Sequence, residues 1–226
     1  MASPYILEAQ ELGRRIPHGE QWLLDRVSLA VRPGDRISCR GPSGSGKSLM
    51  LRALSLLDPL DHGAVLWRGA SVPAERVPEF RSRVIYLHQR PALLPGTVEE
   101  NLRCPFTLEI NKDRHFDRAR ITNWLHLLGR SADMLNLSPD NLSGGEAQLV
   151  VLLRTLQLDP DVLLVDEPTA ALDSDSSKVV ESLIDHWWSE APAKRALIWV
   201  SHDFDQARRV ATRIVLMNQG QLQEEK

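Results

Sequence analysis

Residues 41–48 are the feature that most narrows the folds open to this chain. They read Gly-Pro-Ser-Gly-Ser-Gly-Lys-Ser and fit the pattern G-x-x-x-x-G-K-[ST], in which glycines let backbone N–H groups turn toward phosphate oxygens. An apolar stretch at 37–39 precedes the loop, and a helical pattern at 49–54 follows it. The alternative is a Gly/Ser-rich surface loop. The flanking strand and helix favour a phosphate-binding loop at the positive end of a helix.

The side chains of this loop have distinct predicted tasks. Lys47 would reach the β- and γ-phosphates as a point charge, and the Ser48 hydroxyl would bind Mg²⁺, a hard cation that prefers oxygen ligands. The predicted phosphate-binding residues are Gly41, Pro42, Ser43, Gly44, Ser45, Gly46, Lys47 and Ser48.

A second apolar run ends in two carboxylates. Residues 162–165 are followed by Asp166 and Glu167, as expected of a buried parallel strand that delivers acids to the carboxyl edge of a sheet. Asp166 would hold Mg²⁺ directly or through water, and Glu167 would polarise the water that attacks the γ-phosphate. Two solvated acids at an ordinary strand end are the alternative, which the nearby phosphate loop disfavours.

Residues 142–148 read Leu-Ser-Gly-Gly-Glu-Ala-Gln and lead into a long apolar pattern. Ser143 and Glu146, three residues apart, form a capping box that begins a helix. The adjacent Gly144 and Gly145 allow close backbone approach, so Ser143, the Gly145 N–H and the helix dipole would make a second anion site. Two phosphate sites so far apart need a fold that joins them or a partner chain that supplies one.

With these motifs, the chain resembles the ATP-binding subunits of ATP-binding cassette (ABC) transporters over nearly its whole length. The LSGGE segment looks like that family's signature, which discriminates better than the phosphate loop that many NTPases share. The resemblance implies that Gln89 is the Q-loop glutamine, which would sense the γ-phosphate through Mg²⁺ or water. His202 falls at the switch histidine and would orient the water and Glu167. Asp173 falls in the D-loop, where it would communicate across a dimer interface, cap the following helix, or both.

Two positions depart from the family pattern. Family members stack adenine on an aromatic residue just before the Gly of the first hairpin, and aligning Gly19 puts His18 there, with Trp22 nearby. A histidine ring stacks less extensively than Tyr or Trp, so His18, Trp22 and neither of them stay open as alternatives. Leu149 stands where the family commonly has arginine. No phosphate ligand is lost there, so hydrolysis of ATP remains the expectation.

The 226 residues alternate short apolar strands with helical patterns, which indicates one layered α/β domain. We expect a P-loop NTPase core with a RecA-like, mostly parallel sheet, an N-terminal antiparallel β region, and an inserted helical subdomain. The expected core comprises about 1–89 and 142–226, and the subdomain about 90–141. The expected elements include antiparallel strands within 5–31, a helix at 118–128, and strands at 35–39, 162–165, 196–200 and 214–217.

Composition excludes some functions. The formal net charge of −3 and the lack of a basic tract give no electrostatic case for nucleic acid. Cys39 and Cys104 have no metal-ligand spacing and are predicted to be buried or incidental thiols in a reducing compartment. No run approaches the ~20 apolar residues that span a membrane. The need for ATP and the family resemblance together imply a cytoplasmic chain, peripheral on the inner face of the membrane through a permease.

The resemblance implies a subunit that binds and hydrolyses ATP with Mg²⁺ to power a separate polytopic permease. Two copies would enclose two ATP molecules head to tail, with Lys47 and Ser48 of one chain facing Ser143 and Gly145 of the other. The apolar segment 91–98 would contact the permease or instead pack the helical subdomain.

The transported substrate is an open question at this stage. Segments 94–102 and 153–157 most resemble the ATPase of small bacterial iron-export systems, while an importer of phosphate or an amino acid is the alternative. The rival class, a soluble ABC ATPase of DNA repair, chromosome organisation or translation, usually carries a long coiled-coil insertion or two cassettes. Neither feature is present in this sequence.

Overall fold

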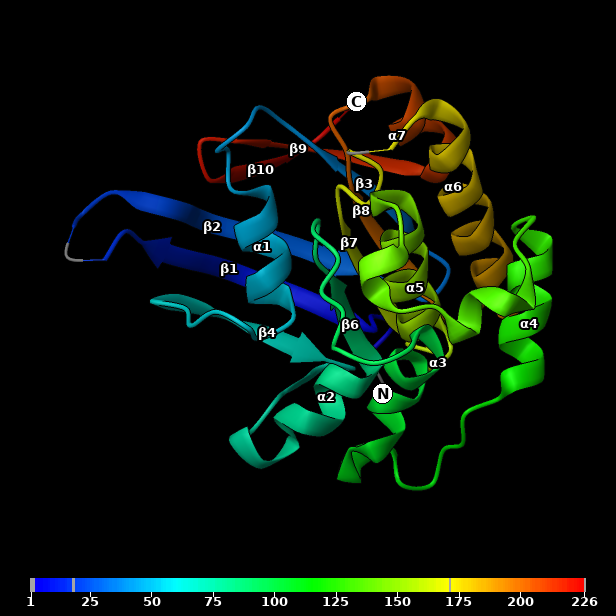
Figure 1. The fold of residues 1–226 in the computed structure, drawn as a ribbon. Helices are drawn as coiled ribbons and strands as arrows, with labels where there is room; N and C mark the ends of the chain where they lie inside the picture. Colours follow the sequence, from blue (N-terminus) through cyan, green and yellow to red (C-terminus); the bar gives the residue numbers. More distant parts are fainter. Residues whose placement is uncertain (1–2, 18, 171, 226) are drawn as a thin grey trace. The chain divides into compact units, whose positions relative to one another are not determined.

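The computed structural model describes residues 3–17, 19–170 and 172–225. Contacts divide the chain into two compact units. The first comprises Met1–Tyr86, Asp161–Glu167 and Ala191–Lys226, and the second comprises Leu87–Pro160 and Pro168–Glu190. Strands belong to the first unit and most helices to the second (Figure 1).

The N-terminal sheet of the first unit is antiparallel. Its strand order is β2-β1-β4-β5, and its strands are β1 (Leu7–Arg15), β2 (Trp22–Val31), β4 (His62–Trp67) and β5 (Ala70–Ser71). Leu7 in β1 lies opposite Val31 in β2 and Trp67 in β4. This sheet confirms the predicted antiparallel region.

The second sheet has the order β10-β9-β3-β8-β7-β6. Its strands are β3 (Arg36–Arg40), β6 (Val84–Leu87), β7 (Val162–Asp166), β8 (Ala196–Val200), β9 (Arg213–Asn218) and β10 (Gln221–Glu224). Strand β3 pairs in parallel with β8 and β9, and β7 pairs in parallel with β8. Strand β10 pairs antiparallel with β9. Every residue of β7 and β8 is buried, which explains their unbroken apolar sequences. The carboxyl ends of β3, β7 and β8 therefore share one edge.

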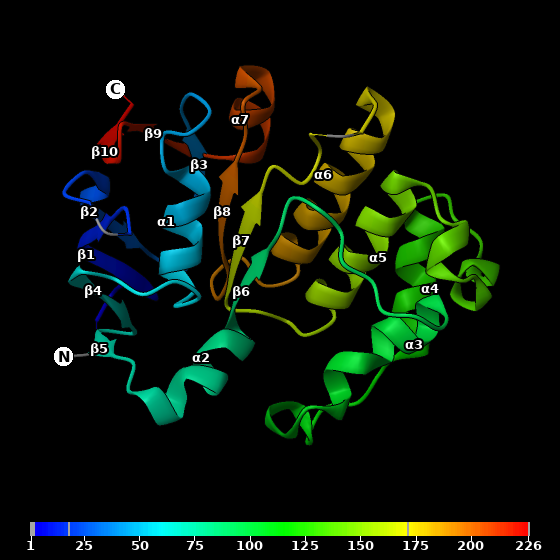
Figure 2. The same ribbon diagram turned by 60° about the vertical axis from the view of Figure 1, so that its left-hand side comes forward.

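The α-helices described in the first unit are α1 (Lys47–Leu54), α2 (Val77–Arg83), which follows a 3-10 turn at Ala74–Arg76, and α7 (Phe204–Val210). Helix α1 packs against β2 and β7, and Figure 2 shows it between the two sheets. Its buried side chains join one apolar core with residues of both sheets, such as Leu12 and Leu164. The helix that follows the phosphate loop is thus fixed along its length.

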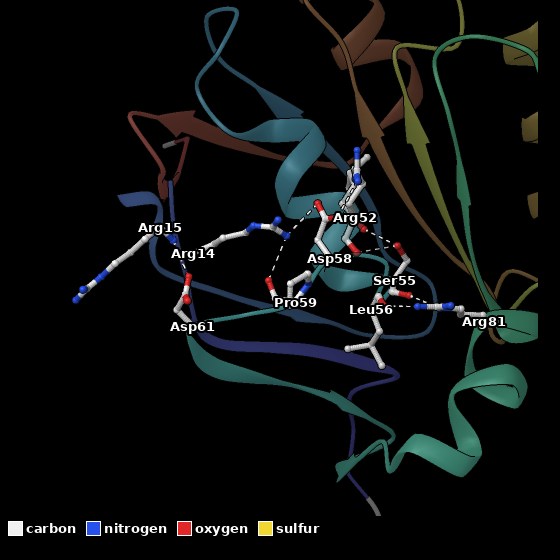
Figure 3. Close-up of polar contacts among 10 residues, drawn as sticks. Arg14, Arg15, Arg52, Ser55, Leu56, Asp58, Pro59, Asp61 and Arg81 are labelled. Atoms are coloured by element: carbon white, nitrogen blue, oxygen red, sulfur yellow. Dashed lines mark hydrogen bonds and ion pairs between the residues drawn. The ribbon is translucent and has the colours of Figure 1, made fainter. Parts of the chain in front are cut away.

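Charged side chains hold the carboxyl end of α1 (Figure 3). Asp58 pairs with Arg52 at 2.7 Å and with Arg14 at 3.2 Å. Arg81 donates to the carbonyls of Ser55 and Leu56, which the last turn of the helix leaves without helical partners. A cation at this end also complements the helix dipole.

The second unit is helical. It contains α3 (Val98–Arg103), α4 (Arg118–Leu127), α5 (Gly144–Leu156) and α6 (Ser174–Ser189), with 3-10 turns at Cys104–Thr107, Glu109–Asn111, Ala132–Asn136 and Pro139–Asn141. Helix α5 packs on α3 and α6. The contacts therefore group α5 and α6 with the inserted helices, whereas the predicted subdomain ends near residue 141. Across the described residues, no helix is both long and apolar enough to cross a lipid bilayer.

Candidate active site

The loop at 41–48 connects β3 to α1 and is built around glycines with positive φ. Gly41 has φ 148° and Gly46, the N-cap of α1, has φ 109°. A Cβ atom on Gly41 would lie 2.0 Å from the Met217 carbonyl oxygen, a separation that no side chain tolerates. Glycine is thus required both for the turn and for the close approach of the loop to β9.

Lys47 is folded over this loop. Its ammonium donates to the carbonyl oxygens of Gly41 and Pro42, each at 2.9 Å, and the residue is 5% exposed. The α1 helix has a glycine N-cap, which carries no capping side chain, and no acid in its first turn. A buried cation beside the amino end of a helix favours an anion at this point. The Ser48 hydroxyl is in the same first turn, and Ser48 is exposed.

Asp166 ends β7 with one carboxylate oxygen bonded and the other not. The Tyr86 hydroxyl donates to its Oδ2 at 2.8 Å, while Oδ1 is buried and has no hydrogen-bond partner among the described residues. An unpaired carboxylate oxygen at a sheet edge suits a hard cation or its water shell. Burial raises the pKa of Tyr86, and the neighbouring Asp166 carboxylate raises it further. The phenol therefore stays protonated and remains a hydrogen-bond donor.

Glu167 and His202 come together although they lie 35 positions apart in the sequence. The Glu167 carboxylate contacts Nε2 of His202, and the Glu167 backbone N–H donates to the Val200 carbonyl oxygen at 3.1 Å. Glu167 adopts φ 46°, which is left-handed backbone, so the residue turns sharply away from β7. The carboxylate is only 16% exposed, and the imidazole is 48% exposed. This arrangement can hold a general base at the strand edge.

Two residues near this edge were not assigned a role from the sequence. Tyr86 interrupts an otherwise aliphatic strand sequence, 84–87, and this is the one signal that could have drawn attention to it. Cys39 is fully buried in β3, and burial raises the pKa of its thiol to about 12, with Asp166 adding to the rise and Lys47 opposing it. The thiol therefore stays protonated.

Ser143 begins α5 in the second unit, with the predicted capping box. Glu146 Oε2 accepts from the Ser143 backbone N–H at 3.0 Å and from its hydroxyl at 2.9 Å, while the Glu146 N–H donates to Ser143 Oγ at 3.3 Å. Arg130 lies 3.4 Å from Glu146 Oε1. The Ser143 backbone N–H, its hydroxyl and then Arg130 lower the pKa of Glu146. Gly144 is exposed, and a Cβ on Gly145 would lie 3.3 Å from Leu172.

Asp173 caps α6. Its carboxylate accepts hydrogen bonds from the backbone N–H groups of Asp175 at 3.0 Å and Ser176 at 2.9 Å. Hydrogen bonds lower the pKa of Asp173, and the bond from the Ser176 hydroxyl has the largest effect. Gln89 is exposed just after β6. Both residues belong to the second unit. The predicted sensing of the γ-phosphate by Gln89 and the predicted communication of Asp173 across a dimer interface stay predictions.

The two candidates for adenine stacking have different outcomes. His18 lies outside the described residues. The Arg15 guanidinium lies over the Trp22 ring, 4.4 Å from the ring centroid. A Cβ atom on Gly13 would lie 2.9 Å from a carbon of the same ring. Arg15 and Arg14 extend in opposite directions in Figure 3, and Arg14 reaches Asp58 at the end of α1. Trp22 therefore packs with Arg15 on β1, and its predicted role in stacking stays a prediction.

Comparison with known proteins agrees with this architecture. The family model for the ABC transporter matches residues 24–170. The probable iron export ATP-binding protein FetA of Escherichia coli K12 is 32% identical over 220 residues, covering 97% of this chain and 95% of that protein. The probable sulfate/thiosulfate import ATP-binding protein CysA of Chlorella vulgaris is 36% identical over 203 residues, covering 88% of this chain and 82% of that protein.

A solved structure gives the same fold. The dimeric, post-hydrolysis ATP-binding cassette MJ0796, bound to ADP and phosphate, superposes with a TM-score of 0.83 at 26% identity, covering 97% of this chain and 98% of that one. The chain therefore belongs to the ABC transporter family, as its motifs predicted. It is an ATP-binding, ATP-hydrolysing subunit of that family, and the expected fold class is confirmed.

Proposed function

We propose that this chain hydrolyses Mg²⁺-bound ATP at the carboxyl edge of its parallel sheet, and that two copies enclose the nucleotides and drive a membrane permease. One observation carries the proposal: three features belong to the same unit. They are the buried Lys47 at the start of α1, the buried Asp166 carboxylate with an unpaired oxygen, and the contact between Glu167 and His202. These groups supply the charge and the base that phosphoryl transfer to water requires.

The side chains divide this chemistry among them. The Lys47 ammonium would exchange the Gly41 and Pro42 carbonyls for phosphate oxygens, and the α1 N–H groups would hold the same phosphates. The Ser48 hydroxyl and Asp166 would hold Mg²⁺, and the family resemblance gives Gln89 a role in sensing the γ-phosphate through the ion or water. When bound, the ion neutralises charge that develops on the phosphates. Glu167 would take the proton of the attacking water while His202 holds its carboxylate in place.

The signature residues Ser143, Gly144 and Gly145 would complete the site of a second copy. A head-to-tail pair has two equivalent sites, each with the phosphate loop of one chain and the α5 start of the other. The dimeric state named for the similar MJ0796 cassette supports this arrangement. Asp173 would lie in that interface while it caps α6.

A permease would contact the second unit through segment 91–98. Leu94 is 51% exposed, yet its backbone N–H and carbonyl are both held by the Asn101 side chain, at 2.7 Å and 2.9 Å. A fixed loop that exposes an apolar side chain suits a docking surface better than a core. Proline residues at 91 and 95 further restrict its backbone.

For the substrate, we propose iron or another metal ion, moved outward. One support is the near-complete mutual coverage with the iron-export relative. The other is the resemblance of segments 94–102 and 153–157 to iron-export ATPases, which was inferred from the sequence. Relatives named for phosphate and sulfate import keep an importer as the second candidate. Proteoliposomes that contain the chain and the permease it co-purifies with decide between them. ATP-driven movement of phosphate rather than iron would overturn the export assignment.

Glu167→Gln tests the hydrolytic assignment. Turnover should fall at least roughly 10²-fold, the scale for loss of a general base, while ATP binding stays intact. With ATP and Mg²⁺ this variant should shift from monomer to dimer in light scattering, and ADP should not cause the shift. Near-normal turnover would place the base elsewhere.

Ser143→Arg tests the shared site, because it puts bulk and charge where the second nucleotide would lie. Alone it should abolish the ATP-driven dimer. Mixed with Lys47→Ala chains it should recover part of the ATPase activity, since one of the two sites in each heterodimer would have neither defect. A demonstrated heterodimer without activity would contradict the model of two independent, shared sites.

A further inference from the structure

Tyr86 and Asp166 meet across neighbouring strands. Tyr86 belongs to β6 and Asp166 is the last residue of β7, the strand next to it in the sheet. The phenol donates to Asp166 Oδ2 at 2.8 Å, a normal length for an O–H···O bond. Asp166 is 4% exposed, so water does not compete freely for this contact.

This hydrogen bond distinguishes the two oxygens of one carboxylate. Oδ2 is taken by Tyr86, whereas Oδ1 is buried with no partner among the described residues. A buried acceptor without a hydrogen-bond partner is unfavourable, so native structures rarely keep such an atom unless it has a specific role. Because rotation of the carboxylate would break the bond to Tyr86, the bond also fixes the direction in which Oδ1 points.

We propose that Tyr86 is a positioning residue that orients the Asp166 carboxylate toward Mg²⁺. This inference rests on the proposed function, in which Asp166 holds the ion of Mg²⁺-ATP. Groups that hydrogen-bond to metal ligands typically change metal affinity or activity by 10–100-fold when they are removed. The alternative is that Tyr86 only ties β6 to β7, in which case its hydroxyl would matter for stability and not for the ion.

Tyr86→Phe removes the hydroxyl and leaves the ring, and Tyr5→Phe is the matched control. The chain has two tyrosines. The Tyr5 ring lies under the Arg32 guanidinium, 5.3 Å from its centroid, and makes no part of the proposed site. Calorimetry would measure ATP affinity in chelator and across a series of Mg²⁺ concentrations, and thermal melting would report folding for both variants.

In Tyr86→Phe, the Mg²⁺ concentration at which ATP affinity is half-enhanced should rise about 10-fold or more, with ATP affinity in chelator unchanged. Tyr5→Phe should match the parent chain in both. An unchanged Mg²⁺ midpoint would overturn the proposal. An equal loss of affinity with and without Mg²⁺ would also overturn it, since a structural defect acts in both conditions.

A double-mutant cycle with Asp166→Asn separates action through Asp166 from other effects. Once the carboxylate is gone, Tyr86→Phe should change the Mg²⁺ midpoint no further. An effect of the same size in both backgrounds would show that Tyr86 acts elsewhere and would reject the proposal. If ATP affinity of the parent chain does not respond to Mg²⁺, the proposed function itself fails; if the parent responds and Tyr86→Phe responds identically, only this inference fails.

Discussion

The starts of α1 and α5 are both rich in glycine and serine, but only the start of α5 has side chains that cap its backbone N–H groups. Helix α1 begins after Gly46, which has no side chain to cap it, and Lys47 brings a cation to its first turn. Helix α5 begins at Ser143, whose hydroxyl accepts from the Glu146 N–H, while Glu146 returns a carboxylate to the Ser143 N–H. The start of α1 is therefore open to an external anion, whereas the start of α5 is capped by its own Glu146 carboxylate.

This difference determines how a phosphate could bind at the amino end of each helix. A phosphate at α1 meets donors that no cap occupies, and it can add its binding energy directly. A phosphate at α5 must first compete for the Ser143 hydroxyl, which donates to Glu146 at 2.9 Å. We therefore expect α1 to govern nucleotide binding by a single chain and α5 to act only when a second chain brings its nucleotide.

The largest expected effect is on nucleotide affinity. Lys47→Met keeps the aliphatic stem and removes the ammonium, so ATP binding should weaken about 10–100-fold, the scale of a charge-assisted hydrogen bond of about 1.5–3 kcal/mol. Ser143→Ala should leave the affinity of monomeric chains unchanged within about twofold. Fluorescent-ATP titration at chain concentrations too low for pairing measures both. Equal losses in the two variants would remove the distinction between the helix starts.

Next in size is helix stability. Ser143→Ala removes an N-cap and should lower the free energy of unfolding by about 1 kcal/mol, whereas Ser43→Ala, in the loop before α1, should change it by less than about 0.5 kcal/mol. Urea titration of nucleotide-free protein gives both values. A larger effect at Ser43 would mean that the phosphate loop is also self-capped.

A smaller effect follows from pH. Ser143 and Arg130 lower the pKa of Glu146, so the folded value lies below the unfolded one. The stabilisation from Glu146 is therefore present above the unfolded pKa and is lost as pH falls through the folded pKa. From about pH 5 to about pH 3, melting temperature should fall more steeply in the parent chain than in Glu146→Gln. The exposed Glu75→Gln serves as the control and should follow the parent, and parallel curves for Glu146→Gln and the parent would deny a role to the capping carboxylate.

The smallest effect concerns the two thiols, one in each unit. Cys39 is buried with its pKa raised to about 12, and Cys104 is partly exposed. At about pH 8, below that raised pKa, a thiol reagent should modify Cys104 in native protein and reach Cys39 only in denaturant. Cys104→Ser should abolish the native reaction. Rapid native labelling of Cys39 would show that the strand beneath the phosphate loop opens.

Local patterns predicted most elements, while side-chain partnerships across strands escaped prediction. The apolar run before Asp166 indicates a buried strand, and Ser143 with Glu146 indicates a helix start, because both signals lie within a few residues. The bond from Tyr86 to Asp166 depends on β6 lying beside β7, 80 positions away in the sequence, and no local period encodes that order. The approach of Arg130 to Glu146 depends in the same way on how helices pack. The Glu167–His202 contact was expected only through family resemblance.

The left-handed backbone of Glu167 has a consequence for how this chain can change over generations. A residue with a β-carbon pays roughly 1–2 kcal/mol to adopt such a conformation, whereas glycine adopts it freely and asparagine more readily than most. Random variation screened only for folded, abundant protein should therefore enrich glycine or asparagine at position 167. Under the proposed mechanism those variants would fold better but lack the general base, so we expect glutamate to persist at this position only where ATP turnover is under selection.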